Sequence, residues 1–221
     1  MKEGSLANMV YAEFRKMILS NQLTRGSRLV ESWWAQKLNV SRVAVREALI
    51  RLSGESLVEF GEKGGCFVKS ITAEDVVEIK ELREVLELGA LKLLSERYDK
   101  EVIAKLEKIC EDFSVMVSGG YLSGACEADV KFHEAIMEGS KNARLLHIYK
   151  SSNIPLFHFK LGSSQSEMND YELTDVEHRK IVKALKKKDY ETARETLIIH
   201  LDRGEKAMLG MVPTGHNAVA G

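Results

Sequence analysis

The sequence predicts a mainly α-helical protein with a small N-terminal part, made of three helices and a hairpin, and a larger C-terminal part of antiparallel helices. Three observations lead to this prediction. The 221 residues include only 2 prolines, which favours long helices because proline breaks them. Apolar residues recur at helical spacing along most of the chain. Residues 1–70 carry 11 Lys and Arg against 7 Asp and Glu, whereas the remaining residues carry 21 against 26.

The composition narrows the class of protein. Hydrophobic residues make up 44% and charged residues 29%, which is typical of a soluble globular protein and not of a disordered one. The 3 cysteines form no CxxC pair, which argues against a disulfide framework and favours the reducing cytoplasm. The N-terminus lacks the apolar run of a secretory signal, and no stretch approaches the about 18 apolar residues of a membrane span. We therefore expect a cytoplasmic protein without a membrane partner.

The first domain is predicted over residues 1–70. Its expected elements are helices over residues 6–19, 31–38 and 41–53, then strands over residues 57–60 and 66–69. Ser41 is a suitable N-cap for the third helix, because its hydroxyl can accept a hydrogen bond from a free amide of the first turn. Glycines at the tip supply the turn of the hairpin. The basic surplus of this domain suggests that it faces a polyanion, with chance as the competing explanation.

The second and third of these helices, joined by a tight turn, fit a helix-turn-helix. Arg42 and Arg46 are four residues apart and share one exposed face at the start of a helix, where a recognition helix presents side chains to the major groove. Guanidinium groups suit this place because they bind guanine edges or phosphate. A solvated arginine pair is the competing interpretation, and the order of the elements outweighs it. The residues expected to contact DNA are Ser41, Arg42 and Arg46 on the helix and Lys63, Gly64 and Gly65 at the hairpin tip, a wing.

The second domain is predicted over residues 72–210, with residues 211–221 as a tail. Residues 72–75 have the pattern of a capping box, which starts a helix that reaches about residue 98. Further helices are expected over residues 100–117, 121–139, 142–161, 171–187 and 189–209. Six consecutive amphipathic helices with short connections imply an antiparallel bundle.

Four polar residues of this bundle share the inward faces of its helices. They are Asp129, His133, His178 and His200. Imidazole and carboxylate groups are suitable ligands for a divalent ion such as zinc or nickel, and an inward carboxylate needs a partner such as a cation. The competing interpretation is that each histidine is a hydrogen-bonded core residue, which is the commoner role of a single inward histidine.

The N-terminal part resembles a known family. The segment NVSRVAVREALIRLSGESLVEFGEKGGCFV is similar to the DNA-binding signature of the GntR family of bacterial transcription regulators, over roughly residues 8–70. The resemblance implies a winged helix-turn-helix that binds a pseudo-palindromic operator as a homodimer. Arg25 departs from the proline usual before the turn glycine. Trp33 and Trp34 also depart from the family pattern, and one of them is expected to fill the core.

Residues 72–210 resemble the all-helical FCD effector domain of the FadR-like branch of that family. In metal-binding members one Asp and three His hold the ion, and a small carboxylate effector often completes its shell. The resemblance therefore assigns the metal to the four inward residues named above. Members that bind acyl-coenzyme A lack this set. Arg83 is the residue we expect to grip the effector carboxylate, and an ion pair with Glu87 is its competing role.

Taken together, these features predict a metabolite-responsive transcription regulator, not an enzyme. The effector would bind at the metal and shift the affinity for DNA. The alternative is a metal-dependent enzyme acting on small organic acids, in which an open metal position activates water. No further inward acid or base forms an obvious motif for that chemistry. A helical module with ordinary core histidines is the third possibility.

Overall fold

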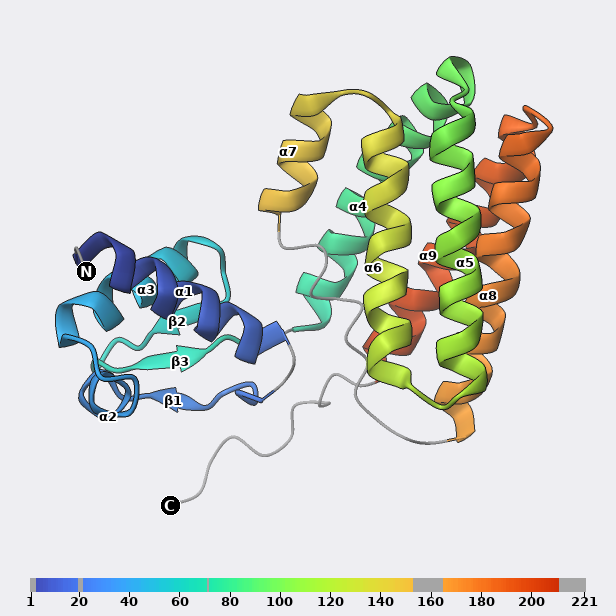
Figure 1. Cartoon of the computed structure of the whole chain (residues 1–221). Coiled ribbons are helices and arrows are strands. Elements are labelled where there is room, and N and C mark those ends of the chain that lie inside the picture. Colours follow the sequence, from blue (N-terminus) through green and yellow to red (C-terminus); the bar gives the residue numbers. More distant parts are fainter. Residues whose placement is uncertain (1–2, 20–21, 71, 153–164, 211–221) are drawn as a thin grey trace. The chain divides into compact units, whose positions relative to one another are not determined.

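The computed structural model describes residues 3–19, 22–70, 72–152 and 165–210. The chain divides into two compact units, Met1–Ile71 and Thr72–Gly221 (Figure 1). The mainly helical architecture predicted from the sequence is confirmed. Within the described ranges, no helix combines the length and the apolar character needed to cross a membrane.

The first unit is a winged helix-turn-helix. Its elements are α1 (Glu3–Leu19), β1 (Arg28–Leu29), α2 (Glu31–Lys37), α3 (Arg42–Gly54), β2 (Val58–Phe60) and β3 (Cys66–Val68). The three antiparallel strands have the order β1-β3-β2, with Arg28 opposite Phe67 and Val58 opposite Val68. The hairpin of β2 and β3 is the predicted one. The strand β1 was not predicted, because two residues are too short to show an alternating pattern.

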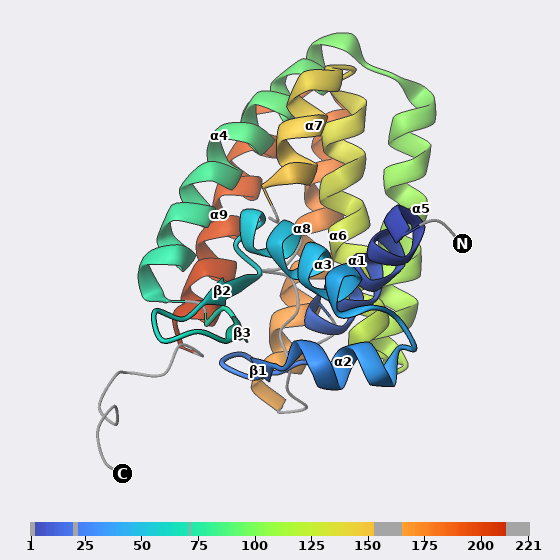
Figure 2. The same ribbon diagram turned by 90° about the vertical axis from the view of Figure 1, so that its left-hand side faces the viewer.

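Local signals in the sequence explain how the helices of this unit begin and pack. The Ser41 hydroxyl caps α3 by accepting from the Ala44 amide at 3.1 Å, as predicted. The apolar side of α3 is buried, and α1 lies alongside it (Figure 2). Trp34 is 4% exposed and meets the ring of Phe14 edge-on, with centroids 4.9 Å apart, whereas Trp33 is 52% exposed. One tryptophan therefore fills the core, as expected.

The second unit is the predicted helical bundle. Its helices are α4 (Ala73–Arg97), α5 (Lys100–Ser118), α6 (Leu122–Gly139), α7 (Ala143–Ser151), α8 (Gln165–Lys186) and α9 (Tyr190–Leu209). The predicted capping box opens α4: Thr72 Oγ1 accepts from the Asp75 amide at 3.0 Å, and Asp75 Oδ2 accepts from the Thr72 amide at 2.9 Å.

Two predicted boundaries in the bundle need comment: one differs in the structure, and the other lies outside the described residues. The helix α8 begins at Gln165 and not near residue 171, because glutamine, glutamate and methionine favour helix even where no apolar stripe marks it. The predicted helix over residues 142–161 appears as α7 to Ser151, and its remainder from residue 153 lies outside the described residues, as does the predicted tail, residues 211–221.

Five of these helices form a closed ring in the order α4, α9, α8, α5 and α6, in which each helix packs against its two neighbours. Their apolar stripes meet in one core, to which Leu91, Leu106, Ile136, Leu185 and Leu197 contribute one residue from each helix. Polar side chains that point into this apolar core are therefore exceptional.

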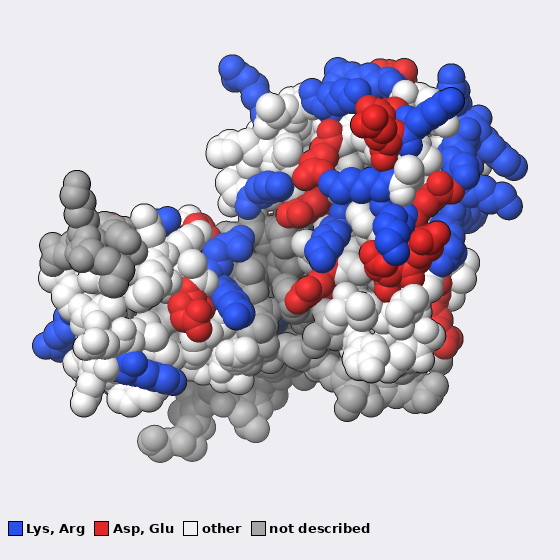
Figure 3. Space-filling model, in the orientation of Figure 1, with Lys and Arg blue, Asp and Glu red and all other residues white. Residues whose placement is uncertain are grey.

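On the face of this unit shown in Figure 3, positive and negative side chains alternate over the surface.

Candidate metal centre

Four inward polar residues meet inside the helix ring. Asp129 and His133 lie one turn apart on α6, His178 comes from α8 and His200 from α9. Each offers one ligand atom, and these four atoms all lie within 4.8 Å of one another. All four residues are buried, with the two most enclosed imidazoles fully shielded from solvent. The structure thus brings together the whole set that the sequence singled out.

Two carboxylates outside the cluster orient two of its imidazoles. His133 Nδ1 lies 2.6 Å from Glu87 Oε2, and His200 Nδ1 lies 2.8 Å from Glu177 Oε2. A neutral imidazole donates from one nitrogen and accepts at the other, so each carboxylate holds the proton on Nδ1 and leaves a lone pair on Nε2. Proteins use this arrangement to orient histidines toward a metal ion.

The centre of the cluster favours a further positive charge. His133 Nε2 and His200 Nε2 lie 3.1 Å apart, a distance at which two lone pairs repel unless a proton or a cation lies between them. Asp129 Oδ1 lies 3.1 Å from His178 Nε2 and adds a negative charge. Three imidazole nitrogens and one carboxylate oxygen suit a divalent ion, so this cluster can hold a metal.

The third imidazole is held by packing. The ring of His178 stacks on that of Phe132, with centroids 3.8 Å apart and planes inclined by 11°. Its Nδ1 has no hydrogen-bond partner among the described residues. Burial lowers the pKa of His178, and burial lowers the pKa of His200 to about 3. Both imidazoles are therefore neutral at pH 7, as metal ligation requires.

The outer carboxylates are charged despite their burial. Burial by itself would raise the pKa of Glu87, but Arg83 and His133 hold that pKa well below its usual range. Burial likewise opposes ionisation of Glu177, yet hydrogen bonds from His200 and Arg203 hold its pKa at about 2. Each carboxylate thus lies between an imidazole of the cluster and an arginine.

Arg83 makes the ion pair with Glu87 that the sequence offered as its competing role, and it also borders the cluster. Its Nε donates to Glu87 Oε1 at 2.8 Å, which is the expected ion pair with the residue one turn later. Its Nη2 lies 3.2 Å from His133 Nε2, so the guanidinium also borders the cluster. Its Nη1 has no hydrogen-bond partner in the part of the chain that the structure describes. An arginine in this position can pair internally and still donate to a ligand.

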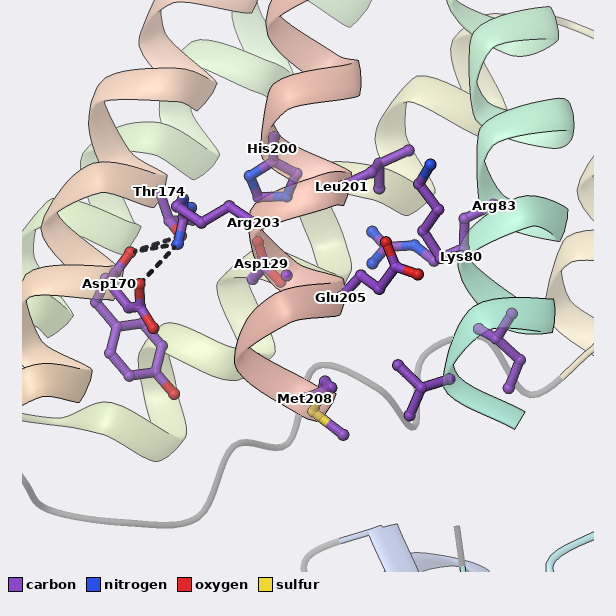
Figure 4. A pocket seen from close by; sticks show the side chains of 14 residues that line it. Lys80, Arg83, Asp129, Asp170, Thr174, His200, Leu201, Arg203, Glu205 and Met208 are labelled. Carbon is purple, nitrogen blue, oxygen red and sulfur yellow. Dashed lines mark hydrogen bonds and ion pairs between the residues drawn. The ribbon is translucent and has the colours of Figure 1, made fainter. Parts of the chain in front are cut away.

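A cavity of about 50 Å³ opens beside the cluster (Figure 4). Its lining includes Lys80, Arg83, Asp129, His200, Arg203 and Glu205. A volume of this size accommodates roughly three to five water-sized groups. Ion pairs hold Lys80 to Glu84 and Asp202, and Arg203 is held by Asp170, Thr174 and Glu177. Arg83 is therefore the cation best placed to meet a small anion that reaches the cluster.

The predicted DNA-contacting residues all lie at the surface of the first unit or at its wing. Arg42 and Arg46 are exposed on α3, and Arg46 makes a long contact of 4.0 Å with Glu31. Gly64 and Gly65 have φ of +85° and +97°, in the left-handed region that side chains disfavour. Lys63, the remaining wing residue, is exposed between the strands.

Sequence reasoning missed one cation at the wing. Arg28 belongs to β1, the strand that left no pattern, and pairing with β3 carries it to the wing. A Cβ at Gly65 would lie 3.2 Å from Arg28 Nε, so the guanidinium packs closely over that glycine. The sequence shows Arg28 only as a basic residue two positions after Gly26. Its place at the wing becomes evident only when β1 pairs with β3.

Comparisons with known proteins match both units. Residues 6–68 match the family model described as bacterial regulatory proteins, gntR family, and residues 78–203 match that of the FCD domain. The HTH-type transcriptional regulator YdhC of Bacillus subtilis (strain 168) is 30% identical, covering 87% of this chain and 86% of that protein. The gluconate operon transcriptional repressor of Bacillus licheniformis is 27% identical, covering 91% and 84%. A solved GntR regulator from Rhodococcus sp. RHA1 is 25% identical, with a TM-score of 0.78 and coverage of 93% and 98%.

The Glu87→Ala variant is expected to lose about 3 kcal/mol of unfolding free energy in metal-free protein, because it leaves Arg83 and His133 buried without their carboxylate. Urea denaturation in the presence of a chelator measures this loss. The control is Asp112→Ala, which removes the exposed ion pair with Lys108 and should cost far less, because solvent screens exposed pairs. Equal losses in the two variants would contradict the central role of Glu87.

Proposed function

The chain belongs to the GntR family and carries an FCD domain, and on that premise we propose that it regulates transcription in response to a small carboxylate bound at a divalent metal ion. The names of the family and of its relatives are those of transcription regulators, not of enzymes. The observation that carries the proposal is a buried Asp and three His beside a cavity bordered by Arg83, in one chain with a winged helix-turn-helix.

The DNA-binding unit would act as half of a cytoplasmic homodimer. Two recognition helices in successive major grooves require a pseudo-palindromic operator. The Arg42 and Arg46 guanidinium groups would contact guanine edges or phosphates, and the Ser41 hydroxyl would donate to a phosphate. Lys63, with the backbone at Gly64 and Gly65, would bring the wing against the duplex. Arg28 would be a further DNA contact of the wing, and its packing over Gly65 supports this role.

The metal would be zinc or nickel, held by Asp129, His133, His178 and His200. Histidine-rich sites with one carboxylate suit either ion. The ion would supply a positive charge that attracts an anionic effector. The Arg83 guanidinium, whose Nη1 has no hydrogen-bond partner among the described residues, would bind the effector carboxylate. If the effector binds more tightly to one arrangement of the two DNA-binding units, it changes the affinity for DNA. The size of that change is set by the difference between its affinities for the two arrangements.

The Arg46→Ala variant is expected to bind DNA about 5- to 150-fold more weakly, since one arginine–guanine contact is worth about 1–3 kcal/mol. Gel shifts with genomic fragments at moderate salt measure this loss. The control is Arg194→Ala, an arginine on α9 of the other unit. A wild-type protein that shows no sequence preference among the fragments would reject the proposed function.

The His178→Ala variant is expected to lose stabilisation by added zinc or nickel. At 100 times the dissociation constant a ligand adds about 2.7 kcal/mol, which raises Tm by roughly 5–10 °C in a protein of this size. Thermal melts after chelation and reloading measure it. Asp129→Asn, nearly equal in shape, should show the same loss, whereas the exposed His147→Ala should respond like wild type. A wild-type protein that neither contains metal nor gains Tm would contradict the site.

The Arg83→Lys variant is expected to keep metal binding and to weaken carboxylate binding about tenfold, because an ammonium cannot form two parallel bonds to a carboxylate. The charge beside Glu87 is retained, so the fold is preserved. Thermal-shift titrations with acetate, lactate, malonate and citrate, with and without zinc, measure the effect. If the acids stabilise the variant as strongly as wild type, Arg83 does not grip the effector.

A further inference from the structure

An exposed apolar side chain stands in the first turn of the recognition helix. Val43 follows the first residue of α3 and is 65% exposed. The helix buries Ala44, Val45 and Ala48 on its opposite side, so Val43 contributes nothing to that core. It lies between the two exposed arginines of the same helix in sequence.

Valine is not the residue that helix stability favours at this exposed position. A β-branched residue forms helix less readily than alanine, because its χ1 is restricted against the preceding turn. Exposure of two methyl groups to water adds no stability. A position that departs from local preferences without a structural gain is a candidate for a functional role.

We propose that Val43 reads a thymine in the operator by packing its methyl groups against the thymine 5-methyl in the major groove. The inference rests on the proposed DNA-binding function and specifies one base of its operator.

The geometry of a recognition helix supports this assignment. Such a helix enters the major groove by its N-terminal residues, and side chains on a helix tilt toward its N-terminus. Val43 is the second residue after the N-cap Ser41, so its methyl groups lie at the N-terminal end of α3, the end that enters the major groove. Arg42 and Arg46 can bind guanine edges or phosphates, but neither group recognises the thymine methyl, which takes an apolar contact.

The stiffness of valine makes the contact specific. One χ1 rotamer accounts for nearly all valines within helices, so the two methyl groups are already in place before DNA arrives. A longer apolar side chain would lose more rotamer freedom on binding. The favourable term is the burial of one methyl group against another, which corresponds to about a fourfold gain in affinity per half-site.

The test replaces thymine by deoxyuridine, which lacks only the 5-methyl. The full-length protein first selects an operator from a random duplex library. Deoxyuridine then replaces the thymines one position at a time, at the equivalent position of both half-sites. Fluorescence anisotropy gives the affinity of wild type and of Val43→Ala for each duplex. We expect one thymine in each half-site at which deoxyuridine weakens wild-type binding about fourfold. We expect Val43→Ala to bind both versions equally.

The matched control is Ile50→Ala. Ile50 is also β-branched and 56% exposed on α3, but seven residues further along, about 10 Å from Val43 on a helix. This variant should discriminate thymine from deoxyuridine as wild type does. Two results overturn the inference while leaving the proposed function intact: a selected operator with no thymine sensitive to the substitution, or a Val43→Ala variant that retains the discrimination. A protein that selects no sequence overturns both.

Discussion

The bundle depends on the neutralisation of buried charge within an apolar ring of helices. Asp129 and three imidazoles occupy the interior of that ring, where an unbalanced charge is costly. Two similar arrangements balance part of the buried charge, because in each a charged glutamate lies between an imidazole and an arginine. Glu87 joins His133 to Arg83, and Glu177 joins His200 to Arg203. These arrangements also aim the imidazole lone pairs at a common point, so the same contacts that permit burial prepare a site for a cation.

This constraint connects the fold to the proposed sensing of a metabolite. Four of the five ring helices supply groups to the centre or to its outer carboxylates, so the site cannot form until the ring closes. The cavity lies at the cluster, and Arg83 belongs both to the charge balance and to the cavity wall. A ligand that engages Arg83 therefore acts on the interaction that holds α4 to α6.

Local signals were predictable, and pairings between distant segments were not. The cap at Ser41, the capping box at Thr72 and the shared face of Asp129 and His133 all depend on residues three or four positions apart. The sequence places Glu177 beside His178, yet its carboxylate bonds His200 on another helix, 23 residues away. Neighbours in a helix point about 100° apart, so adjacency did not reveal the partner. Strand β1 was missed for the same reason: only its pairing with β3 defines it.

The position of Arg83 along α4 has a mechanical consequence. The helix runs without interruption from Ala73 to Arg97 and starts at the junction of the two units. Ten residues separate Ala73 from Arg83, which corresponds to about 15 Å of helix. A hydrogen-bonded helix of this length tilts as a stiff rod. A ligand that displaces the Arg83 guanidinium would therefore tilt the helix and shift its N-terminal end, about 15 Å away.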